Sequence, residues 1–153
     1  MPKSESDLPK GIYEEIDFAV LLQIAGRRIA QHVEAIGKEV GLSAGHLSVL
    51  GMVHRKPGLV QNVYGSILAI NDATLGRYVD KLVEHGLLLR TRSDEDRRTV
   101  RLTLTDPGLA YILTAKSRLA EMRDDIRGGL QGTDISQLEK NLITFLSAEG
   151  ADL

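Results

Sequence analysis

Residues 71–105, NDATLGRYVDKLVEHGLLLRTRSDEDRRTVRLTLT, carry the pattern that decides the fold. Asn71 is a good helix N-cap, because its side-chain oxygen can accept a hydrogen bond from an early helical N–H group. Gly86 can adopt the left-handed conformation that ends a helix. Between them, apolar residues recur at helical spacing; these are Leu75, Val79, Leu82 and Val83. The pattern predicts a helix over residues 72–85.

A β-hairpin is expected directly after this helix. Residues 87–92 and 99–105 can pair as two strands, with the charged residues 93–98 at the tip. The second strand shows the period-two alternation of a half-buried strand; its apolar positions are Val100, Leu102 and Leu104. A short helix with a polar outer face, followed by a ribbon with a charged tip, is the layout of a winged DNA-binding motif.

A second short helix is expected just before the first one. Lys56-Pro57-Gly58 is a strong turn signal, and a helix is predicted over residues 60–69. Its expected buried side consists of Val63, Tyr64, Ile67 and Leu68. Only Ile70 and Asn71 connect the two helices, so they must pack at a steep angle. Two short helices joined in this way predict a helix-turn-helix, in which the second helix enters a DNA groove.

Longer amphipathic helices are expected on both sides of this unit. They are predicted over about residues 13–40, 44–55 with Ser43 as N-cap, 107–127 with Thr105 as N-cap, and after Thr133. The outermost helices are too extended to pack fully on so small a unit, so their apolar faces need a partner. A helical subdomain within the monomer and a homodimer interface both remain open.

The expected organisation is therefore a mainly α fold with a small β-hairpin wing. Residues 1–11 are predicted to be a flexible lead, residues 42–106 a winged helix-turn-helix lobe, and residues 12–41 with 107–153 a helical dimerisation region. The chain lacks cysteine, a signal-peptide core and any apolar run long enough to span a bilayer. It is predicted to be cytoplasmic, without membrane contact.

The charge balance restricts how the chain can bind nucleic acid. The net charge is −2 and aromatic residues make up 4%, which is neither the bulk basic signature of nonspecific binding nor a surface for base stacking. Residues 90–101 contain five arginines against three acidic residues. Any contact with double-stranded DNA must therefore depend on this local positive charge.

The motifs of residues 42–110 resemble the MarR family of winged helix-turn-helix transcriptional regulators. The matching residues, in chain order, are Pro57-Gly58, Gln61, Leu68, Ile70-Asn71, Thr74-Leu75, Arg77, Val79-Asp80-Lys81-Leu82, Gly86-Leu87, Arg90, Asp96-Arg97-Arg98, Leu104-Thr105 and Gly108. The most specific element is the Asp-Arg-Arg of the wing, followed by a strand ending in Leu-Thr and then by a glycine.

The resemblance implies a homodimer with interlocked terminal helices, each recognition helix in a major groove and each wing arginine in the adjacent minor groove. By position it assigns DNA contacts to Asp72, Ala73, Thr74, Gly76, Arg77, Asp96, Arg97 and Arg98. Arg98 would be the minor-groove arginine and Asp96 the acid that orients it, whereas Arg97 would serve a phosphate or an internal ion pair. Two departures stand out, because Val60 and Gly76 occupy positions where hydroxyl side chains are common in the family.

Physical chemistry supports these positions independently. An arginine gains from the enhanced negative potential of a narrow minor groove, and Arg77 on the outer face of its helix can make a bidentate contact with guanine or reach a phosphate. The alternatives are a solvated hairpin tip and a surface ion pair between Arg77 and Asp80 or Glu84.

No pattern for catalysis, a metal ion or another cofactor is present, so the chain is not predicted to be an enzyme. The resemblance implies a small, aromatic or anionic effector bound between the winged lobe and the dimerisation helices. The polar residues expected to reach that region are Tyr13, Arg28, His32, His46 and His54. The resulting hypothesis is a ligand-responsive repressor that binds a pseudo-palindromic operator as a homodimer; the alternatives are a winged-helix protein-interaction module without DNA binding and a metal-dependent regulator.

Overall fold

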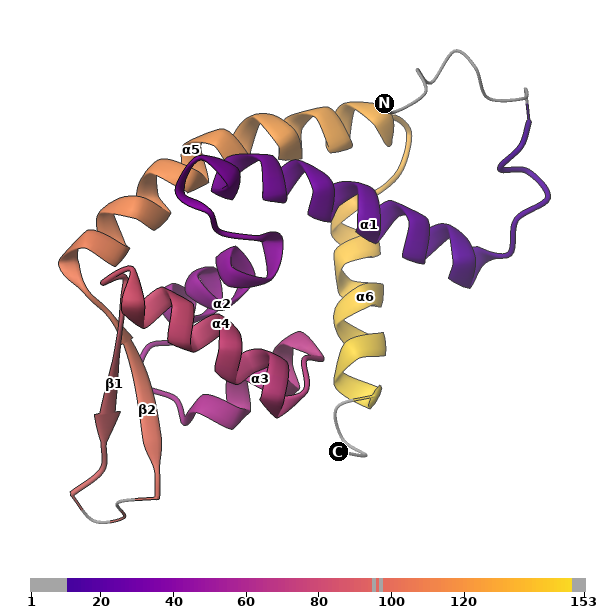
Figure 1. Cartoon of the computed structure of the whole chain (residues 1–153). Coiled ribbons are helices and arrows are strands. Elements are labelled where there is room, and N and C mark those ends of the chain that lie inside the picture. The colour runs from indigo at the N-terminus through magenta and orange to yellow at the C-terminus, as the bar shows by residue number, and fades with distance from the viewer. Residues whose placement is uncertain (1–10, 95, 97, 150–153) are drawn as a thin grey trace.

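The computed structural model describes residues 11–94, 96 and 98–149, and it is mainly helical with one antiparallel hairpin (Figure 1). The lead predicted for residues 1–11 thus lies almost entirely outside the described residues. The elements in chain order are α1 (Phe18–Gly37), the 3-10 helix η2 (Lys38–Val40), α2 (Ala44–Arg55), α3 (Gln61–Leu68), α4 (Asp72–Glu84), β1 (Leu88–Arg92), β2 (Val100–Leu104), α5 (Asp106–Gly129) and α6 (Ile135–Glu149). The predicted mainly helical fold with a two-stranded wing is confirmed.

The core lies in the winged lobe, where α2, α3, α4 and the hairpin meet the start of α5. The fully buried side chains come from each of these elements and include Leu50, Val53, Tyr64, Leu75, Val79, Leu82, Leu88, Leu102 and Ile112. Figure 1 shows α1 and α5 running across the top of this lobe, with α6 standing apart from it.

The recognition helix α4 forms as its sequence predicts. The Asn71 side chain accepts a hydrogen bond from the backbone N–H of Thr74 at 2.8 Å, which confirms it as the N-cap. Leu75, Val79 and Leu82 are buried. Gly86 follows the C-cap with φ +68°. Glycine adopts this left-handed conformation at little energetic cost because it has no Cβ.

The hairpin also follows the predicted pairing. Leu88 lies opposite Leu104, and Arg92 lies opposite Val100. Strand β1 begins one residue later than predicted, and β2 begins one residue later and ends one residue earlier than predicted. The chain entering α3 lies beside β2 as well, because the N–H of Gly58 donates to the carbonyl of Leu102.

The buried side of α3 was predicted partly wrongly. Tyr64 is fully buried and donates its hydroxyl proton to the carbonyl of Lys56, but Val63 and Ile67 remain 39% and 49% exposed. The reason is that α3 approaches its neighbour through Gly65, where an added Cβ would lie 2.9 Å from the carbonyl oxygen of Ile70. A glycine carries no hydrophobic signal, so helical periodicity could not reveal this contact.

The first helix is shorter than predicted. Asp17 caps α1 by accepting a hydrogen bond from the N–H of Ala19 at 2.8 Å, and residues 11–16 form turns instead of helix. At its other end the helix tightens into η2 and stops at Gly41, which has φ +70°. The predicted stop at Gly41 is therefore confirmed.

The two C-terminal helices differ in how much they bury. Thr105 caps α5 as predicted, and Gly108 packs so closely on the Leu87 backbone that a Cβ would collide with it. Helix α5 continues through Gly128 and Gly129, two residues beyond the predicted end. No residue of α6 within Ile135–Glu149 is buried. Its exposed apolar side chains are Leu142, Ile143, Phe145 and Leu146.

Candidate DNA-binding surface and the pocket behind it

The outer face of α4 presents the residues predicted to contact DNA. Asp72, Ala73 and Arg77 are exposed, and Thr74 and Gly76 are half-buried. Arg77 donates a hydrogen bond from its guanidinium to the Thr74 hydroxyl at 3.1 Å, and not to Asp80 or Glu84. An added Cβ at Gly76 would meet nothing within 4 Å, so the missing hydroxyl there leaves open space at the surface.

The wing tip is held by a carboxylate. Asp96 accepts hydrogen bonds from the backbone N–H of Arg98 at 2.9 Å and from the Thr99 hydroxyl at 3.0 Å. In this structure Asp96 therefore shapes the backbone beneath Arg98, whereas the resemblance implied that it orients the guanidinium. Arg97 lies outside the described residues.

Arg90 connects the wing to both helices of the helix-turn-helix. Its guanidinium donates to Asp80 of α4 at 2.5 Å and to Gln61 of α3 at 3.1 Å. All three residues belong to the motif that carries the family resemblance, but periodicity does not show that a strand arginine joins two helices. The contact ties β1 to both α3 and α4.

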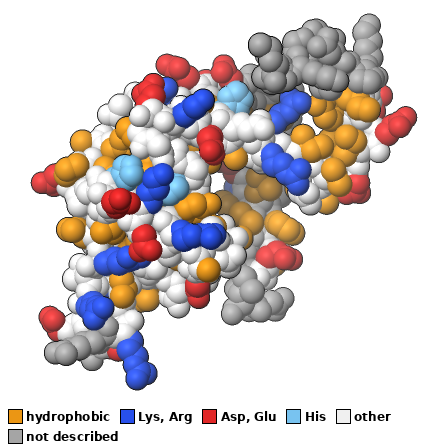
Figure 2. All heavy atoms as spheres, viewed as in Figure 1, with side chains coloured by type: hydrophobic (Ala, Val, Ile, Leu, Met, Phe, Trp, Pro, Cys, Tyr) orange, Lys and Arg blue, Asp and Glu red, His pale blue; other side chains and the backbone are white. Residues whose placement is uncertain are grey.

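The wing tip and the start of α4 lie on one face. Asp72 of α4 and Arg98 of the wing line the same surface hollow of about 320 Å³, together with Gln61 and Asn62 of α3. Figure 2 shows acidic and basic side chains both near the tip of the wing and over the body of the lobe. The excess of arginine within residues 90–101, not the net charge of the chain, distinguishes this surface.

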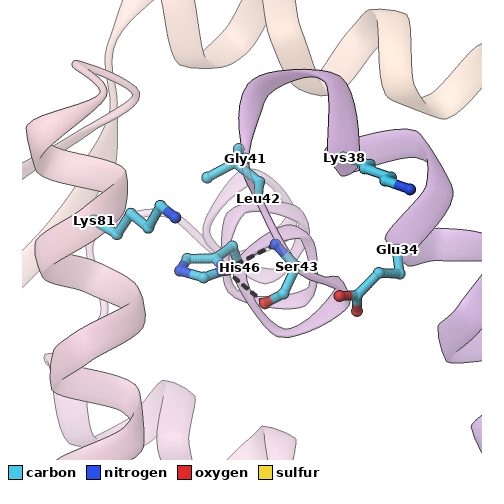
Figure 3. A pocket seen from close by; sticks show the side chains of 7 residues that line it. All are labelled: Glu34, Lys38, Gly41, Leu42, Ser43, His46 and Lys81. Atoms are coloured by element: carbon cyan, nitrogen blue, oxygen red, sulfur yellow. Dashed lines mark hydrogen bonds between the residues drawn. The ribbon is translucent and has the colours of Figure 1, made fainter.

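A larger hollow of about 460 Å³ lies behind this surface, between α1, α2 and α4 (Figure 3). His46 of α2 and Lys81 of α4 lie on one side of it, and Glu34 of α1 and Lys38 of η2 lie on the other. Lys81 links the hollow directly to the recognition helix.

His46 is the buried polar group of this hollow, with 8% of its surface exposed. Its Nδ1 accepts a hydrogen bond from the backbone N–H of Ser43 at 3.0 Å, and its ring packs on Tyr78 with the centroids 4.7 Å apart. Burial, followed by the charges of Lys81 and His85, lowers the pKa of His46, and Glu34 opposes this effect. The imidazole is thus kept neutral as a helix-capping acceptor.

The five residues predicted to bind an effector do not converge. Arg28, in the middle of α1, donates to the Tyr13 hydroxyl at 2.6 Å, and His32 is exposed on the same helix. His54 does not line the hollow, and its Nε2 contacts the ammonium of Lys116 on α5 at 2.8 Å. Of the five, His46 lines the 460 Å³ hollow, where the remaining polar groups are Glu34, Lys38, Ser43 and Lys81. The sequence did not group these residues, because they come from α1, η2, the N-cap of α2 and α4, which are separated along the chain.

Neither a metal site nor a membrane span is found in the described part of the chain. No group of three or more His, Cys, Asp or Glu side chains there can hold a metal ion. None of the helices among residues 11–149 has the length and apolarity needed to cross a bilayer.

A helix-turn-helix with a hairpin wing defines the chain as a winged helix-turn-helix protein. A model of the MarR family matches residues 40–99. A curated relative, the HTH-type transcriptional regulator BilQ of Clostridium symbiosum (strain WAL-14163), is 31% identical over 110 residues, covering 72% of this chain and 74% of BilQ. The chain therefore belongs to the MarR family of DNA-binding transcriptional regulators, which are not enzymes.

Solved structures agree with this assignment. The transcriptional repressor CouR, bound to a 23-mer DNA duplex, matches with a TM-score of 0.73 and 28% identity over 92% of this chain and 99% of that chain. A SlyA-like transcription regulator from Listeria monocytogenes has the same fold, with a TM-score of 0.80 at 18% identity over 90% of this chain and 91% of that chain.

Proposed function

We propose that the protein is a ligand-responsive repressor that binds a pseudo-palindromic operator as a homodimer. Helix α4 enters the major groove and the wing tip reaches the adjacent minor groove. The observation that carries the proposal is the shared hollow of Asp72 and Arg98, which brings the start of the recognition helix and the wing arginine onto one face. The DNA-bound repressor CouR supports it by its similarity over almost the whole chain.

Exposed apolar side chains on the terminal helices support the homodimer. Helix α1 buries only Gly37, and α6 buries no residue within its described range. Phe18, Phe145 and Leu146 are 70%, 57% and 65% exposed. Burying these faces between two copies would remove apolar surface from water, which stabilises the dimer by roughly 25 cal/mol for each Å² buried. We therefore assign residues 12–41 and 107–153 to the dimer interface and residues 42–106 to the DNA-binding lobe.

The wing assignment is tested by replacing its arginine. Arg98→Ala is expected to weaken operator binding by about 1–3 kcal/mol, and Arg98→Lys by less, because lysine keeps the charge but loses the planar fork. Fluorescence anisotropy with DNA from upstream of the gene, at several salt concentrations, measures both affinity and salt slope. Arg123→Ala on the exposed side of α5 is the matched control, because it removes the same charge away from the proposed DNA surface. Since α5 belongs to the proposed dimer region, size-exclusion chromatography first checks that this variant keeps the oligomeric state of the unaltered protein.

Three results would count against the proposal. An affinity and a salt slope that are both unchanged in Arg98→Ala would remove the wing from the DNA contact. A monomeric chain in size-exclusion chromatography that shifts no upstream DNA would instead support the protein-interaction module. Loss of operator binding on addition of a chelator would support the metal-dependent regulator.

The effector is proposed to act at the 460 Å³ hollow, because that hollow joins the helices of the dimer region to the recognition helix. A ligand bound there shifts the equilibrium between two orientations of the lobes. The size of the shift is set by the difference between its affinities for the two orientations. Operator affinity measured with and without the ligand gives this coupling directly.

A further inference from the structure

The base of the wing is anchored by apolar contacts, but its outer part is not. Leu88 at the start of β1 and Leu102 in β2 are fully buried, whereas the four residues of β1 after Leu88 are exposed. Figure 1 shows the hairpin extending past α3 and α4. A two-stranded hairpin is only marginally stable without support from other elements. The direction of the wing is therefore fixed where the hairpin leaves the helices.

Arg90 lies at this point, because its partner on the opposite strand is the buried Leu102. Its Nε donates a hydrogen bond to Gln61 of α3 at 3.1 Å, and its Nη1 donates to Asp80 of α4 at 2.5 Å. The two bonds leave the planar guanidinium from different nitrogen atoms, so together they fix both its position and its orientation. A lysine would offer a single nitrogen in place of this rigid fork.

The ion pair of Arg90 and Asp80 is too exposed to add much to the stability of the fold. Their side chains are 33% and 66% exposed, and solvent screens such pairs strongly. Asp80 also places a negative charge on the exposed face of α4, where it repels the phosphates of DNA. This acidic residue is therefore unfavourable for DNA affinity unless it has a second task.

We propose that Arg90, held by Asp80 and Gln61, is a positioning residue for DNA binding. It fixes the wing at the angle from which Arg98 reaches the minor groove while α4 occupies the major groove. The proposal rests on the proposed function, since it requires that the wing and α4 contact DNA together.

A small tilt of the strand at Arg90 has a large effect at the tip of the wing. A strand advances about 3.3 Å per residue, so Ser93 lies roughly 10 Å beyond Arg90, and a tilt of about 10° would move it by about 2 Å. Hydrogen bonds to a base or a phosphate tolerate only a few tenths of an ångström. Gln61 also lines the hollow that Asp72 and Arg98 share, so this contact adjoins the surface that must match the DNA.

The first test removes the acidic residue from the recognition helix. Asp80→Ala should weaken operator binding about tenfold, in line with the loss of one charge-assisted hydrogen bond, although it deletes a negative charge from the exposed face of α4. Glu84→Ala is the matched control, because it removes the same charge from an exposed position one turn further along α4 and should leave the affinity unchanged or raise it. Arg90→Lys keeps its charge but loses the fork, and should weaken binding by a similar factor. Fluorescence anisotropy with DNA from upstream of the gene measures all three.

A second measurement separates positioning from a direct contact with DNA. If Arg90 acts through Arg98, then adding Arg90→Lys to Arg98→Ala should weaken binding no further, because the contact that Arg90 places is already lost. A direct contact of Arg90 with DNA would reduce the affinity by the same factor in both backgrounds. The Tm of Arg90→Lys and of Asp80→Ala should stay within a few degrees of that of the unaltered protein, because exposed ion pairs contribute little to stability.

The proposal is overturned by operator binding that is unchanged or tighter in Asp80→Ala, by equal factors in the two backgrounds, or by variants that are unfolded at the temperature of the assay. If Arg98→Ala weakens operator binding while Arg90→Lys and Asp80→Ala do not, the positioning role is rejected and the wing contact of the proposed function stands. If Arg98→Ala has no effect, the wing contact fails and the positioning role fails with it.

Discussion

The winged lobe and the terminal helices of this protein treat apolar side chains in opposite ways. In the lobe, Leu50, Tyr64 and Leu102 are fully buried. On α6, Leu146 is 65% exposed, and no residue between Ile135 and Glu149 is buried. The lobe buries most of its large apolar side chains by itself, although Val63 and Ile67 of α3 stay exposed. The apolar side chains of the terminal helices, in contrast, are largely left exposed in a single copy of the chain. The stability of the lobe should therefore be intrinsic, and that of the terminal helices should depend on assembly.

The largest expected effect is in the core of the lobe. Leu50→Ala should lower the free energy of unfolding by about 2–5 kcal/mol, because it leaves a cavity that the surrounding helices fill only partly. Urea denaturation followed by circular dichroism measures the change. Leu50→Met is the control and should cost less than about 1.5 kcal/mol, since it conserves volume. If Leu50→Ala lowers the free energy of unfolding by no more than Leu50→Met does, the stability of the lobe does not depend on its own core.

A smaller effect, on association, is expected at α6. Leu146→Ala should weaken the dimer by about 2 kcal/mol for each altered side chain, close to the value for burying a leucine. Analytical ultracentrifugation over a range of concentrations measures it, and Leu146→Met should associate nearly as well as the unaltered protein. If the dimer of Leu146→Ala has unchanged affinity, Leu146 does not lie in the interface, and the stability of α6 does not depend on assembly through this residue.

A gain in stability is expected at Gly76, the unpacked position of the recognition helix. Gly76→Ala should raise the free energy of unfolding by about 1 kcal/mol, because alanine has the higher helix propensity and its Cβ would meet nothing within 4 Å. Thermal denaturation shows the gain as a higher Tm. A decrease would mean that the lobe needs the flexibility of glycine there.

The smallest expected effect concerns pH at the boundary between the two regions. The pKa of His46 is lowered from its ordinary 6.5 by burial and by the neighbouring charges of Lys81 and His85, with Glu34 acting in the opposite direction. The unfolded chain therefore binds more protons than the folded one just below pH 6.5, and stability should fall as the pH drops through that region. Urea denaturation at several pH values should show a shallower decline in His46→Asn, which keeps a polar capping side chain but does not titrate. An equal decline would assign the pH dependence to other groups.

Much of the winged lobe was predictable because its signals are local. The Asn71 cap, the stop at Gly86 and the alternation along β2 each depend on a few neighbouring residues, and each is confirmed. The Thr105 cap and the stop at Gly41 belong to the same class. A capping or turn residue provides hydrogen-bond partners for backbone groups that lie within a few positions of it in the sequence.

Predictions that depended on which side of a helix meets a neighbour were less accurate. Val63 and Ile67 were assigned to the buried side of α3, but Gly65 makes the close approach. On α5, the small residues Gly108 and Ala115 are buried as well. Small residues allow the closest contacts between elements, and they carry little of the hydrophobic signal from which a buried face is predicted.

The sequence by itself determined the family, the order of helices and strands, and the presence of a wing with arginine at its tip, because these depend on short-range patterns. The tertiary structure alone decided that Arg90 joins the wing to Gln61 and Asp80, and that Glu34, His46 and Lys81 meet around one hollow. Those contacts join residues 10 to 47 positions apart, and their geometry is set by the angles at which helices pack. Packing angles depend on the shapes of both partners, which no local pattern contains.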